Sequence, residues 1–162
     1  MKNKFILILL VLFVNLNLAN YISADEFIFD TSDIKISDNG NIIDASNGLV
    51  TSNNDKIKII GDNFQYNKIL SLLKVGNGII TSSNDNIEII ADNFQYDQNL
   101  SLINATGDVI VKSLTQKVTF KSQSVRYNIK ERVVVSETES EIVDGQGNLF
   151  SMKGFTYTLN DN

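Results

Sequence analysis

Two stretches of ten residues decide the fold: residues 57–66 read IKIIGDNFQY and residues 87–96 read IEIIADNFQY. They are part of a longer repeat, because residues 47–72 align with residues 77–102 at an offset of 30 without a gap, with 17 identities across 26 positions. Self-similarity at a fixed period of this length is typical of stacked units that bury their apolar faces on one another.

Inside each unit the side chains alternate between apolar and polar, which is the pattern of a strand with one buried face. Residues 56–59 alternate polar residues with isoleucine, and residues 64–66 alternate aromatic rings with an amide. The parity of the apolar positions switches between these two segments. We therefore expect a bulge or corner at residues 61–63, and again at residues 91–93, that keeps both segments facing inward.

Diverged copies flank this pair of repeats. A third copy contains Val118-Thr119-Phe120 and Val125-Arg126-Tyr127, and a weaker leading copy contains Ile34-Lys35-Ile36. Turns are predicted where Asn, Asp and Gly accept a positive φ, at Asn39-Gly40, Asn47-Gly48, Asn77-Gly78, Gly107-Asp108 and Asp144-Gly145. A second set of turns is predicted at Tyr66-Asn67-Lys68, Tyr96-Asp97-Gln98 and Tyr127-Asn128.

The predicted fold class is all-β. About eight strands are expected, near residues 41–50, 56–66, 69–80, 86–96, 99–112, 117–128, 132–143 and 148–159. Helical spacing of apolar residues does not persist, β-branched residues dominate, and the 162 residues include no proline that would interrupt a strand ladder. The expected shape is an antiparallel β-jelly roll or rolled, V-shaped sheet built from two-strand repeats of about 30 residues, with a small closed barrel as the alternative.

The N-terminus has the pattern of a secretory signal peptide. Lys2 and Lys4 precede an apolar run over residues 5–14, and Ala24 offers a small residue at the cleavage point. We expect residues 1–24 to be a signal peptide and residues 25–162 to form one exported domain. Cleavage would leave 12 basic and 19 acidic residues, a net charge of −7. No cysteine follows the apolar run, so a lipid anchor on cysteine is not expected.

Composition also limits the chemistry. The chain has no His and no Cys, so imidazole bases, thiol nucleophiles, disulfides and the usual zinc sites are absent. A net charge of −5 argues against nucleic acid as a partner. No nucleophile with a base and no paired carboxylates stand out from the repeat, so we expect no enzyme, no metal and no cofactor.

The repeat resembles the OstA-like family of lipopolysaccharide-transport proteins. Its members share the motif I-x-I-x-A-D-x-x-x-Y-[DN], a hydrophobic strand ending in Ala, and then G-[ND]-V-x-V. Here residues 87–97 match the first element, residues 100–105 the second and residues 106–111 the third, and Ser124-Val125-Arg126-Tyr127-Asn128 looks like a further copy. The likeness covers roughly residues 27–159.

Two branches of the family are relevant: free periplasmic bridge proteins of the LptA type, and the N-terminal periplasmic domain of the outer-membrane assembly protein LptD. Because the sequence ends at Asn162, we expect a stand-alone bridge protein or a fragment that carries only the N-terminal domain. A β-repeat surface protein or adhesin without lipid transport is the alternative from a different class.

The resemblance implies a jelly roll opened into a groove whose apolar interior shields the acyl chains of lipid A and helps to deliver lipopolysaccharide to the outer membrane. The pattern itself brings apolar residues onto one inward surface, which is a core if it closes and a lipid path if it stays open. The candidate groove residues are Ile57, Ile59, Phe64, Tyr66, Leu72, Ile87, Ile89, Phe94, Tyr96, Leu102, Val109, Val111, Val118, Phe120, Val125 and Tyr127, with Leu70 and Leu100 on the same predicted face.

Charged residues add two weaker hypotheses. Lys117, Lys121 and Arg126 belong to a basic cluster that could contact lipid phosphates or sugars, although a solvated outer face is the simpler interpretation of such a cluster. Glu137, Glu139 and Glu141 alternate along a predicted strand and could bind a divalent cation or keep an edge soluble.

The expected partners are lipopolysaccharide and other lipopolysaccharide-transport proteins, the latter through open sheet edges near residues 34–43 and 149–159. Head-to-tail self-association could use the same edges. The expected location is the periplasm, with the outer membrane as a further site of association.

Overall fold

The computed structural model describes residues 27–159, so the predicted signal peptide at residues 1–24 lies outside the described residues. These residues form one antiparallel sheet in which successive strands pair from β1 to β8, and the last strands pair out of sequence order. The elements are β1 (Ile28–Ser37), the short 3₁₀ helix η2 (Asp38–Gly40), β2 (Ile42–Ser52), β3 (Ile57–Asn67), β4 (Leu72–Ser82), β5 (Ile87–Asp97), β6 (Leu102–Ser113), β7 (Val118–Asn128), β8 (Val133–Ser136), β9 (Ser140–Val143), β10 (Leu149–Met152) and β11 (Phe155–Thr158).

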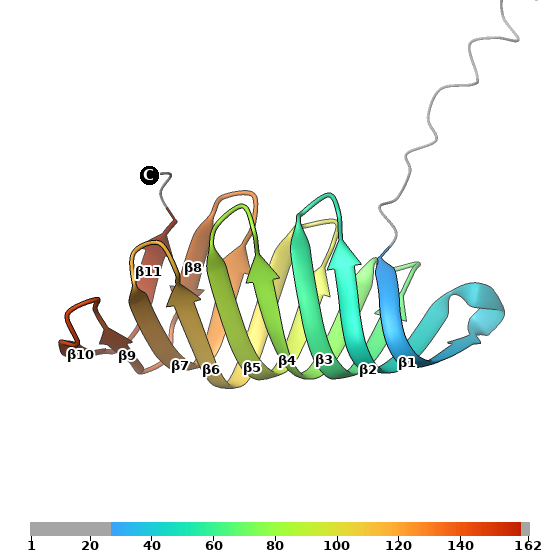
Figure 1. Ribbon diagram of the computed structural model, residues 1–162, viewed down its shortest axis with the longest axis horizontal. Helices are drawn as coiled ribbons and strands as arrows, with labels where there is room; N and C mark the ends of the chain where they lie inside the picture. Colours follow the sequence, from blue (N-terminus) through green and yellow to red (C-terminus); the bar gives the residue numbers. More distant parts are fainter. Residues whose placement is uncertain (1–26, 160–162) are drawn as a thin grey trace, which may run out of the picture.

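Each long strand bends near its middle, so the single sheet folds into two facing walls (Figure 1). The first wall contains residues 57–60 of β3 and 87–90 of β5, and the second wall contains residues 64–67 and 93–97 of the same strands. The hairpin loops of both walls lie on the same side, opposite the bends (Figure 1). The sheet is therefore a trough whose long axis runs across the strands.

The bend lies where the sequence predicts a change of face. In β3 the buried positions are Ile57, Ile59 and Gly61 before the bend, and Phe64 and Tyr66 after it. The ladder between β5 and β6 shifts register between Ile90 and Asn93, and the ladder between β6 and β7 shifts at the equivalent place. The predicted bulge or corner is confirmed.

Asparagine and glycine make the bend possible. Asn47, Asn77 and Asp108 have φ values of 46°, 45° and 41°, and they lie inside strands at the bend. A Cβ on Gly78 would lie 2.6 Å from the carbonyl oxygen of Ile60, so only glycine fits there without a backbone shift. The prediction that the Asn47, Asn77 and Gly107-Asp108 pairs form chain-reversing turns is therefore wrong: these residues turn the sheet through its corner.

The chain reverses at two other sets of loops, which form the two rims of the trough. The first rim consists of loops 53–56, 83–86 and 114–117, and the second rim consists of loops 68–71, 98–101 and 129–132. On the second rim the predicted turns are confirmed, because Asn67, Asp97 and Asn128 each accept a hydrogen bond from the backbone N–H three residues later, at 3.0 Å.

The two ends of the sheet differ from prediction. β1 is a full edge strand that pairs with β2 over most of its length, whereas the sequence suggested only a weak leading copy. The last two expected strands are each interrupted: β8 and β9 pair with different halves of β7, and β11 and β10 pair with β8 and β9. Glu137 and Glu139 lie in the interruption, so they do not share a strand face with Glu141.

Candidate functional site

The inner surface of the trough is mainly apolar, and the buried serines Ser122, Ser136 and Ser140 bond to one another near its C-terminal end. Thirteen of the sixteen predicted groove residues are buried and lie in one core cluster: Ile57, Ile59, Phe64, Tyr66, Ile87, Ile89, Phe94, Tyr96, Val109, Val111, Phe120, Val125 and Tyr127. Successive strands contribute them in register, because Ile59 pairs with Ile80, Ile80 with Ile89 and Ile89 with Val111. The inward direction of these residues is confirmed, whereas their contact with lipid is still a hypothesis.

The remaining predicted groove residues lie elsewhere. Val118 is half-buried and packs against the core. Leu72 and Leu102 are half-buried at the starts of β4 and β6, and the next residues, Leu73 and Ile103, are fully buried instead. Their placement on the inward face is therefore wrong. Leu70 and Leu100 are exposed in second-rim loops, at 58% and 60%.

The correction has a clear physical reason. The loops of the second rim end with a residue of positive φ, Ser71 or Ser101, and this conformation breaks the alternation that the Leu-Ser-Leu sequence suggests. The strand then starts in the register set by its neighbour, in which Leu73 lies opposite both Tyr66 and Tyr96. Leu73, Val75, Ile80 and Ile103 are among the buried residues that sequence analysis missed. For Leu73 and Ile103, the signal is this pairing with the inward tyrosines on both neighbouring strands.

Aromatic rings fill both ends of the trough. At the N-terminal end the ring of Phe27 meets Tyr66 edge-on at 4.8 Å between centroids and Tyr96 at 5.5 Å. At the C-terminal end Phe120 stacks on Phe155 at 4.6 Å and contacts Tyr157 at 4.7 Å. The chain's own side chains thus occupy the interior at each end.

The mouth between the two rims is crossed by a row of side-chain hydrogen bonds, which we call the seam. Tyr96, from the second wall, donates its hydroxyl to Asp55 in a first-rim loop. Tyr127 donates in the same way to Asp85 of the next first-rim loop. Tyr157 of β11 donates to Gln116 of the third first-rim loop. Three tyrosines on one side of the mouth therefore bind three loops on the other side.

Additional donors reinforce the first two contacts. Ser101 of the second rim donates to Asp55 at 3.3 Å. The Asp85 carboxylate accepts a hydrogen bond from Arg132 Nε of the second rim at 2.6 Å. It also accepts one from Ser82 Oγ at 3.3 Å. The Asp85 side chain is only 3% exposed, so its charge is held away from water and is satisfied by these donors. Two causes raise the pKa of the Tyr127 hydroxyl well above its ordinary value: burial is the larger, and the hydrogen bond to the Asp85 carboxylate is the second. The hydroxyl therefore stays protonated and remains a donor.

The predicted phosphate-contact residues do not converge. Lys117 is exposed in a first-rim loop, whereas Lys121 and Arg126 are exposed on either side of the bend in β7. Arg126 lies 3.5 Å from Glu137. These three cations therefore lie on different parts of the outer surface, and contact with phosphate stays a prediction for each of them separately.

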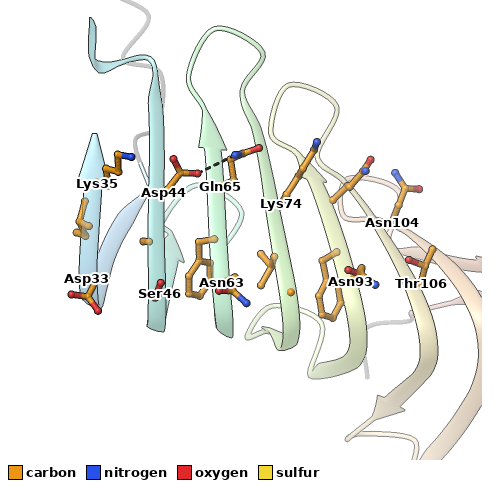
Figure 2. Close-up of a pocket in the computed structure, with 17 residues that line it drawn as sticks. Asp33, Lys35, Asp44, Ser46, Asn63, Gln65, Lys74, Asn93, Asn104 and Thr106 are labelled. Atoms are coloured by element: carbon orange, nitrogen blue, oxygen red, sulfur yellow. Dashed lines mark hydrogen bonds between the residues drawn. The ribbon is translucent and has the colours of Figure 1, made fainter. Parts of the chain in front are cut away.

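The outer face of the second wall carries a hollow of about 930 Å³. Two rows of polar side chains cross it from β1 to β6, and the labelled residues of Figure 2 follow these rows. Gln65 donates to Asp44 at 3.0 Å within the upper row, and Asn63 and Asn93 repeat in the lower row. Along their strands these polar residues alternate with the buried Phe64, Val75 and Phe94, so the two rows face away from the apolar interior.

No helix within residues 27–159 combines the length and apolar character needed to cross a membrane. Over the same residues, no three carboxylates come together as a metal site.

No protein-family model and no curated protein sequence matches this chain. A solved structure does match it. The fold is similar to that of LptH. This protein from Pseudomonas aeruginosa is described as the LptA homologous periplasmic component of the conserved lipopolysaccharide transport device. The match to LptH has a TM-score of 0.62 at 9% sequence identity, and it covers 79% of this chain and 94% of the LptH chain. The match establishes the fold, and the predicted all-β, jelly-roll class is confirmed.

Proposed function

We propose that this protein binds lipopolysaccharide in the periplasm and shields its acyl chains between the two walls during transport to the outer membrane. The observation that carries this proposal is the row of buried apolar side chains that runs across neighbouring strands from β2 to β8 on the inner surface. The fold shared with LptH, a periplasmic component of a lipopolysaccharide transport device, supports the same role.

The physical basis is burial of hydrocarbon. Each CH₂ group kept from water contributes about 0.8 kcal/mol, so acyl chains lying along the trough axis would be held strongly without any chemical step. Because side chains such as Ile59, Ile80, Ile89 and Val111 follow one another across neighbouring strands, a chain could slide past them without meeting a large desolvation barrier. Sugars and phosphates would stay in water at the rims. The role requires no catalysis.

Photo-crosslinking in living cells tests this proposal. A photoreactive amino acid at Phe94, which is 1% exposed inside the trough, should form adducts with lipopolysaccharide. The same amino acid at Gln95, the next residue on the outward face, is the matched control and should give none. Adducts from Gln95 as strong as those from Phe94, or none from Phe94 and Phe120 together, would contradict the proposal.

The open edges of the sheet support docking of other transport proteins or of a second copy. β1 is the edge strand at one end, and its Ile36 is 63% exposed. Replacing Ile36 with proline should weaken self-association or partner binding while the monomer stays folded, because proline removes a backbone donor from the edge. Light scattering and pull-down with purified protein measure this effect, and unchanged association would argue against docking at β1.

A surface protein with a permanently filled trough is the second candidate, and the aromatic clusters at both ends favour it. Such a protein would lie outside the cell and would be removed by protease added to intact cells. A periplasmic protein would resist that treatment and would co-purify with lipopolysaccharide. The same fractionation, followed by mass measurement of the native protein, also separates a stand-alone bridge protein from the N-terminal domain of a larger assembly protein.

A further inference from the structure

We propose that the seam is a latch: it holds the two rims together and closes the trough, and it must part for an acyl chain to enter. This inference rests on the proposed lipid-binding function and adds how access to the interior is controlled. It follows from the way that the three tyrosine contacts cross the mouth.

The contacts of the seam form a repeated device. In each, a strand of the first wall ends at a buried serine, and the acceptor follows three residues later in the first-rim loop: Ser52 and Asp55, Ser82 and Asp85, Ser113 and Gln116. The tyrosine that reaches each acceptor lies 41 or 42 residues further along the chain, on the opposite side of the mouth. Each of the three first-rim loops is therefore tied to the opposite side of the mouth by one tyrosine.

The seam is also where the two walls can separate most easily. Along each rim, backbone hydrogen bonds join neighbouring loops, as between Leu114 and Asn86 at 2.9 Å on the first rim and between Gln98 and Ser71 at 3.0 Å on the second. Across the mouth, the contacts described above are made by side chains. Parting the rims therefore breaks side-chain bonds and exposes the interior, while the ladder of each wall stays intact.

The three contacts differ in strength. Asp55 and Asp85 are carboxylates, and hydrogen bonds to a charged acceptor are roughly twice as strong as neutral ones. Arg132 adds an ion pair to the second contact. The third acceptor, Gln116, is a neutral amide. The chain next to this third contact is also divided into strands of four residues, β8 to β11. The contacts at Asp55 and Asp85 therefore contribute most of the free energy that keeps the two rims together.

A covalent staple tests the latch. The chain has no cysteine, so a thiol-specific reagent modifies only the two cysteines that are introduced by mutation. The double variant N84C/E131C places one cysteine on each of the two loops that Asp85 and Arg132 connect, and a flexible bis-maleimide joins them across the mouth. The matched control, N53C/N84C, receives the same reagent within the first rim. Both positions of each pair are exposed.

Binding of a fluorescent C16 fatty acid and of purified lipopolysaccharide is then measured before and after stapling. We expect stapling of N84C/E131C to lower the rate of uptake by tenfold or more and stapling of N53C/N84C to leave it within twofold. Equal uptake by both stapled proteins would overturn the latch while leaving the proposed function intact. Failure of the unstapled proteins to bind either probe would overturn the proposed function itself, and the latch with it.

Point variants supply an independent measurement without any staple. Tyr127→Phe keeps the ring in the core and removes the hydroxyl, so uptake should accelerate about tenfold because one charge-assisted bond no longer opposes opening. Tyr157→Phe removes the neutral contact and should accelerate uptake by less than about threefold. Uptake by Tyr127→Phe at the rate of the unmodified protein, or slower than by Tyr157→Phe, would overturn the latch.

Discussion

Replacing Asp85 with alanine should destabilise the protein by about 3 kcal/mol. The carboxylate is 3% exposed and accepts three hydrogen bonds, from the Tyr127 hydroxyl, from Arg132 Nε at 2.6 Å and from Ser82 Oγ at 3.3 Å. Removing one partner of a buried ion pair costs about 3–5 kcal/mol. Arg132 is 28% exposed and can regain water, which places the expected loss at the lower end of that range.

Two matched variants make the prediction specific to the ion pair. Asp55→Ala removes hydrogen bonds from a different tyrosine and serine, Tyr96 and Ser101, to a less buried carboxylate, and should cost about 1–2 kcal/mol. Asp62→Ala removes an exposed carboxylate at the bend, which accepts one bond from Asn77 at 3.1 Å, and should cost less than about 1 kcal/mol.

Urea unfolding followed by far-UV circular dichroism measures these free energies, provided that the slope with urea is the same in all variants. Asp62→Ala should have the highest free energy of unfolding of the three variants, Asp55→Ala a lower one and Asp85→Ala the lowest. A loss below about 1 kcal/mol for Asp85→Ala, or a loss no larger than that of Asp55→Ala, would refute the view that a satisfied buried charge holds the second contact of the seam.

Three further predictions concern the core and its titration. Phe94→Ala should lower the free energy of unfolding by about 3–5 kcal/mol, because a ring that is 1% exposed leaves a cavity; a loss under 1 kcal/mol would mean that the ring is dispensable. Leu73→Ala should cost about 2–5 kcal/mol and Leu72→Ala less than half as much, and the reverse order in thermal denaturation would contradict the observed register. Because the pKa of Tyr127 is raised above its ordinary value of 10.0, its contribution is complete below about pH 10 and should be lost as the pH rises further, where the unfolded chain ionises first. Tyr127→Phe should therefore show a smaller loss of stability above pH 10 in urea titrations, and an identical loss would exclude this residue as the cause.

The strands and their inward faces could be predicted because the alternation that specifies them is local. Expected segments such as 86–96 lie within a few residues of the observed strands, and the change of parity between Ile59 and Phe64 correctly located the bend. Where two local structures need the same backbone conformation, the sequence alone could not choose between them. Asn77-Gly78 suits a hairpin turn and a strand corner equally, because both need a positive φ.

The seam could not be predicted from the pattern at all. Asp55 and Tyr96 recur in the next copy as Asp85 and Tyr127, but the spacing within each pair reflects the facing of two walls and not any local periodicity. The register error at Leu72 has a similar origin, since the side chains of β4 are fixed by their partners on β3 and β5. Contacts between distant strands decide these features, and a single sequence contains no direct record of them.

The meander of the sheet makes the length of the trough adjustable. Every long strand pairs with its neighbours in sequence, so one 30-residue unit can be added or deleted without altering the cross-section of the rest. Each unit inserts two strands and extends the interior by about 9.5 Å, at the usual spacing between strands of roughly 4.8 Å. Duplication of such a unit would thus set the length of the interior, and the copies at residues 47–72 and 77–102, identical at 17 of 26 positions, are one such pair.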